Sequence, residues 1–267
     1  MKIIFYSFFI LLVALFSCKN ATENKPVAPT ANDQNDVNNK NIITKDSNDI
    51  IVVGPSPIYD SLPKLSFEAI SEATFLQYKK REKKTLITSK PIEKDSFFYF
   101  NTQSKKWRFK DKVRDWQQLN DETWYDYVGY DSALKMYVIT ENSASENLGF
   151  GALMLIDNLT NSHYELASVG DGAVNTPIPS PHTRFLVYYY NYQYELKNGF
   201  IGLLKMNNRQ NPRTFLMEHA SYNSEDWGIE DLVWIDDNSF AVKGYEEIYE
   251  NDKLVKHFSY YKSMRFE

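Results

Sequence analysis

The chain has 267 residues and a formal net charge of −5, and 43% of its residues are hydrophobic and 15% aromatic. This length and composition are sufficient for one large domain with a hydrophobic core. They make the chain a poor candidate for binding nucleic acid, because phosphate backbones are bound by clustered Lys and Arg.

The first eighteen residues have the layout of a bacterial secretory signal. Lys2 gives a positive start, residues 3–16 are nearly all apolar, and a small residue precedes Cys18. The apolar run is shorter than the roughly 20 residues of a membrane-spanning helix. Residues 15–18, Leu-Phe-Ser-Cys, resemble the bacterial lipobox, in which the cysteine is lipidated. The resemblance implies a signal peptide over residues 1–17 and a membrane anchor through lipid on Cys18.

Residues 19–49 are rich in Asn, Asp, Lys and Thr and contain little that could be buried. Such a segment gains too little from burial to offset the entropy of ordering, so we expect residues 18–49 to be a lipidated, disordered tether. The Asn-rich composition resembles that of lipoproteins of the Bacteroidota. This resemblance implies a lipid anchor in the outer membrane of the cell envelope. We expect the domain on the periplasmic side, with surface exposure as the alternative.

Cys18 is the single cysteine of the chain. The remaining residues can therefore form no disulfide, no thiolate metal site and no cysteine nucleophile. A short helix is expected over residues 65–83, with the basic run 79–84 as its solvated end.

A similarity with an offset of fifty residues indicates internal repeats. Each unit reads as short strands, rich in aromatic and branched residues, between turns of Asn, Asp, Ser and Gly. Weaker copies occur at residues 97–102 and 238–242. The aligned segments are residues 149–158 with 199–208, 135–138 with 185–188, and 163–166 with 213–216.

Units of this length with several antiparallel strands are typical of propeller blades. Residues 50–267 hold four or five such units, so the sequence predicts a single all-β, propeller-like domain, with a β-sandwich as the alternative. Residues 180–184, Ser-Pro-His-Thr-Arg, resemble the Ser-Pro-Asp-Gly-Lys turn of periplasmic propellers. Residues 236–238 predict a hairpin turn. The last unit lacks an outer strand, which residues 49–53 could supply to close the ring.

No catalytic motif stands out in the sequence. There is no Gly-rich phosphate loop, no nucleophile elbow and no pair of histidines with helical spacing. The four histidines are far apart and lack the spacing of metal ligands. The sequence therefore predicts no catalytic residue, no metal site and no cofactor, and it favours a role without catalysis.

Two acidic-aromatic clusters, at residues 122–127 and 225–231, recur where strands begin. In a propeller these positions would lie near the central channel, where a Trp ring could stack on a sugar and carboxylates could bind its hydroxyls. Packing of both Trp rings between blades is the alternative. Residues 188–194, with five Tyr, are a second candidate for partner contact. The candidate ligand-binding residues are Trp124, Asp126, Trp227, Glu230 and Asp231.

Three functions fit these observations. The first is a monomeric binding or scaffold module of the cell envelope, held at the membrane, for a glycan, peptide or protein. The second is an envelope hydrolase that uses two carboxylates among Asp126, Glu230 and Asp231. The third is a structural subunit of an envelope assembly. The missing catalytic set favours the first, and no nucleic-acid partner is expected.

Overall fold

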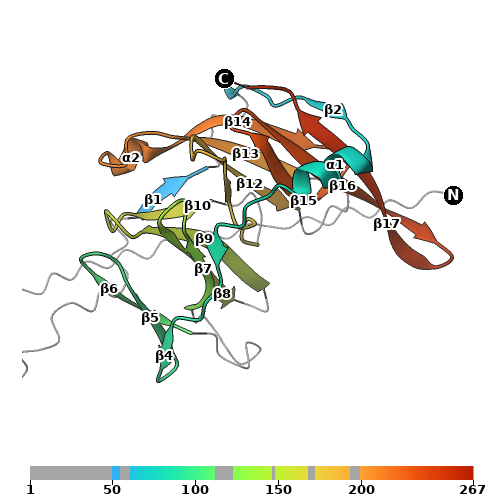
Figure 1. Cartoon of the computed structure of the whole chain (residues 1–267). Helices are drawn as coiled ribbons and strands as arrows, with labels where there is room; N and C mark the ends of the chain where they lie inside the picture. Colours follow the sequence, from blue (N-terminus) through green and yellow to red (C-terminus); the bar gives the residue numbers. More distant parts are fainter. Residues whose placement is uncertain are drawn as a thin grey trace, which may run out of the picture. The chain divides into compact units, whose positions relative to one another are not determined.

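The computed structural model describes residues 50–54, 61–111, 123–145, 148–167, 172–192 and 199–266. All of them belong to the unit Lys40–Glu267. They form four β-sheets and two short helices, which confirms the predicted all-β class (Figure 1). The predicted signal peptide, Cys18 and the tether lie outside the described residues. No helix among the described residues is long and apolar enough to cross a membrane.

Sheets A and D contain the first half of the described chain. Sheet A has the strand order β1-β10-β9-β8-β7-β3, and sheet D has the order β4-β5-β6. All pairings in both sheets are antiparallel except that of β1 with β10. The strands are β1 (Ile50–Val53), β3 (Leu86–Ile87), β4 (Ile92–Lys94), β5 (Phe97–Asn101), β6 (Lys106–Lys110), β7 (Thr123–Asp131), β8 (Met136–Ser145), β9 (Leu148–Asp157) and β10 (His163–Leu166).

Sheets B and C contain the second half. Sheet B has the order β11-β12-β13-β14, and sheet C has the order β15-β16-β17-β2, so a strand from near the start of the described chain completes the last sheet. The elements are β2 (Phe67–Ala69), β11 (Ile178–Pro179), β12 (Phe185–Asn191), β13 (Gly199–Met206), α2 (Pro212–Phe215), β14 (Leu216–Ser224), β15 (Gly228–Asp236), β16 (Ser239–Glu250) and β17 (Lys253–Ser263).

The outer strand of the last sheet is not the one that the sequence suggested. Residues 49–53 were expected there, but β1 pairs with β10 in sheet A, where Val53 is buried in the core. The edge of β17 is instead taken by β2, which places Phe67 against Trp227 and Phe240. The expectation for residues 49–53 is therefore wrong. A short apolar strand can pair with the open edge of more than one sheet, so the sequence of such a strand does not identify its partner.

Helix α1 (Glu72–Lys79) is shorter than the predicted span of residues 65–83. The Ser71 side chain caps it by accepting a hydrogen bond from the Thr74 N–H at 3.2 Å, and this fixes where the helix begins. Phe75 is the buried residue of the helix and packs on Val233 and Ala241 of sheet C.

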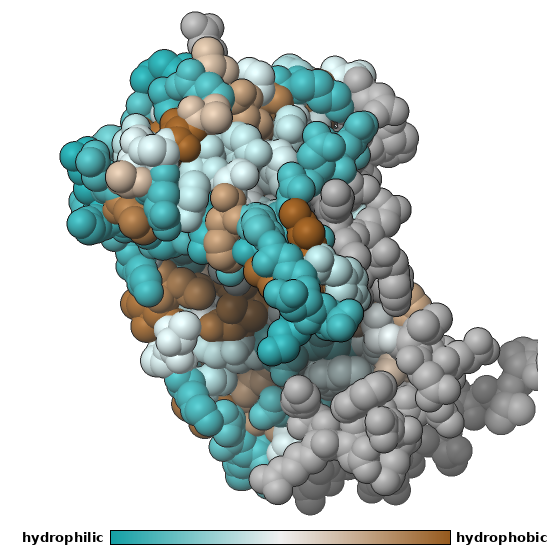
Figure 2. Space-filling model, turned by 90° about the vertical axis from the view of Figure 1, so that its right-hand side faces the viewer, coloured by the Kyte–Doolittle hydropathy of each residue, from teal (hydrophilic) through white to brown (hydrophobic). Residues whose placement is uncertain are grey.

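Sheet B is covered on both faces. One core cluster joins it to sheet A and includes Leu155 and Tyr188, and a second joins it to sheet C and includes Ile201 and Phe240. Consecutive tyrosines of β12 therefore enter different cores, because strand side chains alternate between faces. Residues 188–192, the described part of the tyrosine-rich segment considered for partner contact, are thus packed on both sides. Figure 2 shows a largely hydrophilic face with smaller areas of exposed hydrophobic residues.

Residues 180–184 form a tight turn between β11 and β12. Thr183, which replaces the glycine of the propeller turn that this segment resembles, has a φ of 54°. Its N–H donates to the Ser180 carbonyl at 2.9 Å, and the Ser180 hydroxyl accepts from the Phe185 N–H at 3.2 Å. The hairpin predicted at residues 236–238 is also confirmed, since Trp234 pairs with Phe240 across it.

Candidate binding site

Residues 123–127 of the first predicted cluster lie on β7 in sheet A, and residue 122 lies outside the described residues. The Trp124 side chain is buried, and the Asp126 carboxylate accepts a hydrogen bond from Asn142 Nδ2 on the neighbouring strand at 2.9 Å. Both residues thus have contacts within their own sheet.

Trp227, the Trp of the second cluster, lies just before β15 and is only 6% exposed. Its ring stacks on Tyr261, with centroids 4.9 Å apart, and on Tyr222, with centroids 5.6 Å apart. Gly244 leaves room for the indole, because a Cβ there would lie 3.0 Å from Trp227 Cε3. The structure therefore places this ring in the core between sheets B and C, away from solvent.

The two carboxylates after Trp227 are paired with lysines. Glu230 contacts Lys256 at 2.8 Å, and this hydrogen bond raises the pKa of Lys256 above its ordinary value. Asp231 contacts Lys79 of α1 at 2.9 Å. Burial alone would lower the pKa of Lys79, but its hydrogen bonds to Glu82 and Asp231 outweigh burial and raise that pKa. The predicted site residues thus form two groups, one on sheet A and one on sheet C.

A cavity of about 920 Å³ opens at a different place, beside β1, the β9–β10 turn and α2. Its wall combines hydroxyl and amide groups and one guanidinium with an apolar surface that is larger than the polar one. The lining residues are Thr160, Asn161, Ser162, Asn211, Thr214, Arg213, Ile50, Ile51 and Pro212.

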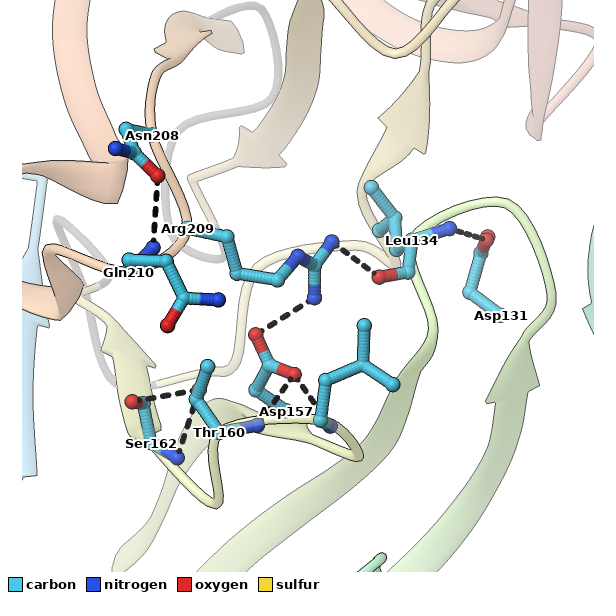
Figure 3. A network of polar contacts seen from close by, with 9 residues as sticks. Asp131, Leu134, Asp157, Thr160, Ser162, Asn208, Arg209 and Gln210 are labelled. Atoms are coloured by element: carbon cyan, nitrogen blue, oxygen red, sulfur yellow. Dashed lines mark hydrogen bonds and ion pairs between the residues drawn. The ribbon is translucent and has the colours of Figure 1, made fainter.

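An ion pair supports the cavity from behind (Figure 3). Arg209 Nη1 donates to Asp157 Oδ2 at 2.6 Å, and Nη2 donates to the Leu134 carbonyl at 2.7 Å. Asp157 is fully buried, and its Oδ1 accepts from the Thr160 N–H at 3.2 Å. Thr160 Oγ1 lies 2.8 Å from Ser162 Oγ. This network holds the two hydroxyls of the cavity wall in place.

The opposite wall is formed by α2 and the residues before it. Asn207 Nδ2 donates to the Thr214 carbonyl at 2.9 Å, and the Arg209 guanidinium lies 4.6 Å from the ring centroid of buried Phe215. Arg213 is exposed, and no described residue forms an ion pair with it. Its five N–H donors can therefore serve a ligand.

The chemistry of this wall is suited to binding. Hydroxyl and amide groups both donate and accept hydrogen bonds, and a guanidinium binds carboxylates and carbonyls. The described residues contain no group of three or more His, Cys, Asp or Glu that could hold a metal ion. Sequence reasoning missed this site because its residues carry no catalytic or binding motif, although the two turns lie at the fifty-residue offset of the repeat and could have been compared for that reason.

The fold and the cavity define an all-β protein with a pocket of mixed polar and apolar lining between two sheet corners. No protein-family model matches the chain, and neither the curated proteins nor the solved structures contain a match.

Proposed function

We propose that this protein is a lipid-anchored binding module of the bacterial cell envelope, and that the cavity beside α2 holds its ligand. The observation that carries the proposal is the wall of hydroxyls and amides around Arg213, supported by the buried Arg209–Asp157 pair. Rigid polar groups in a concave site give orientation and specificity to a bound ligand. The ligand class is a hydroxylated or amide-rich molecule, a glycan or a peptide.

The anchor is proposed from the sequence. Residues 1–17 are the signal peptide, Cys18 carries the lipid, residues 18–49 are the tether, and residues 50–267 are the binding domain. The domain begins at β1, and Ile50 and Ile51 of β1 line the cavity.

The arrangement proposed for the domain is a propeller-like series of repeated units. Strands β7–β10, then β11–β14, then β15–β17 with β2 support it, because each group is a four-stranded antiparallel series. Sheet D would be a fourth, smaller unit. In propellers, the last sheet is often completed by a strand from near the N-terminus, as β2 completes sheet C here.

Binding is favoured over hydrolysis and over a purely structural role. Asp126 is held by Asn142 on sheet A, whereas Glu230 and Asp231 are held by lysines on sheet C. A glycosidase needs two carboxylates about 5 to 10 Å apart across an open cleft. A protein with a purely structural role would not need a pocket that is lined by an exposed guanidinium, that of Arg213.

The test is a binding screen of the full chain against oligosaccharide and peptide fragments of bacterial cell walls. We expect at least one class to bind, and Arg213→Ala to weaken it roughly tenfold. Lys243→Ala on sheet C is the matched control and should leave affinity unchanged. Absence of binding by every fragment, or equal affinity of Arg213→Ala and the unaltered chain, would contradict the proposal.

A further inference from the structure

Sheet D presents two chemically different faces. Its inner face is aromatic: Phe98 and Phe109 are buried against Ile139 and Met154 of sheet A. Because side chains alternate along a strand, the residues between these point away from sheet A. The strand register therefore determines which side chains lie on the outer face of sheet D.

The register places four cations on this outer face. Phe97 pairs with Lys110, Tyr99 with Arg108 and Asn101 with Lys106, while Lys94 of β4 pairs with Phe97. None of the side chains that share this face is a carboxylate. A concentration of positive charge of this kind is unexpected on a chain whose net charge is −5. The cations of the outer face are Lys94, Lys106, Arg108 and Lys110.

The aromatic rings of this face hold cations. The Arg108 guanidinium lies 3.7 Å from the Phe97 ring centroid, and Lys106 Nζ lies 5.1 Å from the Tyr99 centroid. Stacking of this kind orients a cation without neutralising its charge. No described residue forms an ion pair with Lys106 or Arg108. Their N–H donors are therefore available to an anionic partner.

The spacing of the cations indicates the form of that partner. Lys106, Arg108 and Lys110 occupy every second position of β6, so their Cα atoms are about 6.8 Å apart in a straight row. An extended peptide with an acidic residue at every second position repeats its carboxylates at the same interval. Ile92, which is 69% exposed, lies on β4 beside Tyr99, at the opposite edge of sheet D from the row.

We propose that the outer face of sheet D binds an extended acidic peptide segment of a partner protein, with carboxylates at alternate positions facing Lys106 and Arg108. Arg108 is the central contact, because a guanidinium can hold a carboxylate through two parallel hydrogen bonds. A membrane surface is a poorer occupant, because Phe97 and Tyr99 are covered by the cations and cannot insert. This site is separate from the cavity and does not depend on its function.

The experiment measures fluorescence anisotropy of two labelled peptides with the full chain. One peptide alternates Glu and Thr, and the other has the same composition with the Glu residues grouped in one block. We expect the alternating peptide to bind roughly fivefold more tightly, because only its carboxylates match the row. Its affinity should fall as salt is added, since exposed charges are screened.

Variants then locate the contact. Arg108→Gln and, separately, Lys106→Gln should each weaken the alternating peptide roughly tenfold. Lys262→Gln is the control, because Lys262 is paired with Glu68 on sheet C and should leave affinity unchanged. Lys106 is exposed, so its variant tests the proposal even if Arg108→Gln does not fold. Equal binding of the two peptides, or tighter binding of a sulfated glycan than of the alternating peptide, would overturn the proposal.

Discussion

Arg209, in the connection between β13 and α2, donates to the buried carboxylate of Asp157 at the end of β9, 52 residues earlier. The pair joins a corner of sheet B to a corner of sheet A. A similar contact joins sheets B and C, where the His182 backbone N–H and ring Nδ1 lie 2.9 and 2.7 Å from the Asp237 carboxylate. Polar turns thus tie neighbouring sheets together at their ends, while aromatic and branched residues fill the space between them.

Replacement of Arg209 should destabilise the domain. Arg209→Ala leaves Asp157 charged and buried without its partner, which costs roughly 3 kcal/mol. Urea unfolding followed by circular dichroism measures the loss. Arg213→Ala, four positions along the chain and exposed, is the matched control and should change stability by less than about 0.5 kcal/mol. Similar midpoints for the two variants would show that the ion pair contributes little.

The Asp237 contact should make stability depend on pH on the acid side. Burial alone would raise the pKa of Asp237, but hydrogen bonds from the His182 backbone, the Ser180 side chain and the His182 ring outweigh it and lower the pKa. A lowered folded pKa contributes stability above the unfolded value of about 3.9, and that stability is lost as pH falls through the folded value.

Asp237→Asn tests this dependence. We expect the thermal midpoint of the unaltered chain to fall more steeply than that of the variant between about pH 5 and pH 2. Asp95→Asn, at an exposed turn of sheet D, is the control and should follow the unaltered chain. Parallel curves for Asp237→Asn and the unaltered chain would mean that this carboxylate is not coupled to folding.

Gly202 should be intolerant of any side chain. It lies directly across from Tyr188 in sheet B, and a Cβ at this position would overlap the tyrosine ring. Gly202→Ala should therefore lower stability by roughly 1 to 3 kcal/mol, because both residues are buried and the ring cannot move freely. At Gly149 a Cβ would meet nothing within 4 Å, so Gly149→Ala should be neutral or slightly stabilising. Equal melting temperatures for the two variants would contradict this account.

Trp227→Ala should act chiefly on stability. The indole is enclosed by Tyr222, Tyr261 and Phe67, so its removal leaves a cavity that costs roughly 3 to 5 kcal/mol. Denaturant unfolding measures this loss. A variant that kept full stability but lost affinity for a partner would restore the ligand-platform role that the sequence suggested.

Cys18 is the residue on which the proposed anchor depends. Cys18→Ala should abolish labelling with radioactive palmitate and move the protein from the membrane fraction to the soluble fraction, because the acyl chains supply the membrane affinity. Ser17→Ala, which keeps a small residue before the cysteine, is the control and should be labelled normally. Palmitate labelling of the Cys18→Ala protein would show that the lipid is attached elsewhere.

Local patterns predicted local structure well. The hairpin at residues 236–238 and the turn at residues 180–184 follow from turn chemistry, which acts over a few positions. The all-β class follows from strand-sized apolar segments between turn residues. The partner of β17 did not follow, because β1 and β2 are both short segments with strand-forming residues, and the tertiary fit of Phe67 separates them.

The candidate site was harder to predict for a related reason. An acidic-aromatic cluster can be an exposed platform or a core ring with paired carboxylates, and the sequence around Trp227 is compatible with both. Its stacking partner Tyr261 is 34 residues away, so burial of the ring cannot be read locally. The cavity beside α2 has no sequence signature, because it forms only where two turns from different sheets meet.

The pairing of β2 with β17 also has a consequence for the order of synthesis. Ala69 lies opposite Tyr261, so β2 leaves the ribosome almost two hundred residues before β17, the strand that it pairs with among the described residues. Sheets D, A and B can be assembled from a growing chain, but sheet C cannot. Any chain released before the last strand would leave β2 without the strand that it pairs with, and this unpaired segment is a site for proteolysis of the incomplete product.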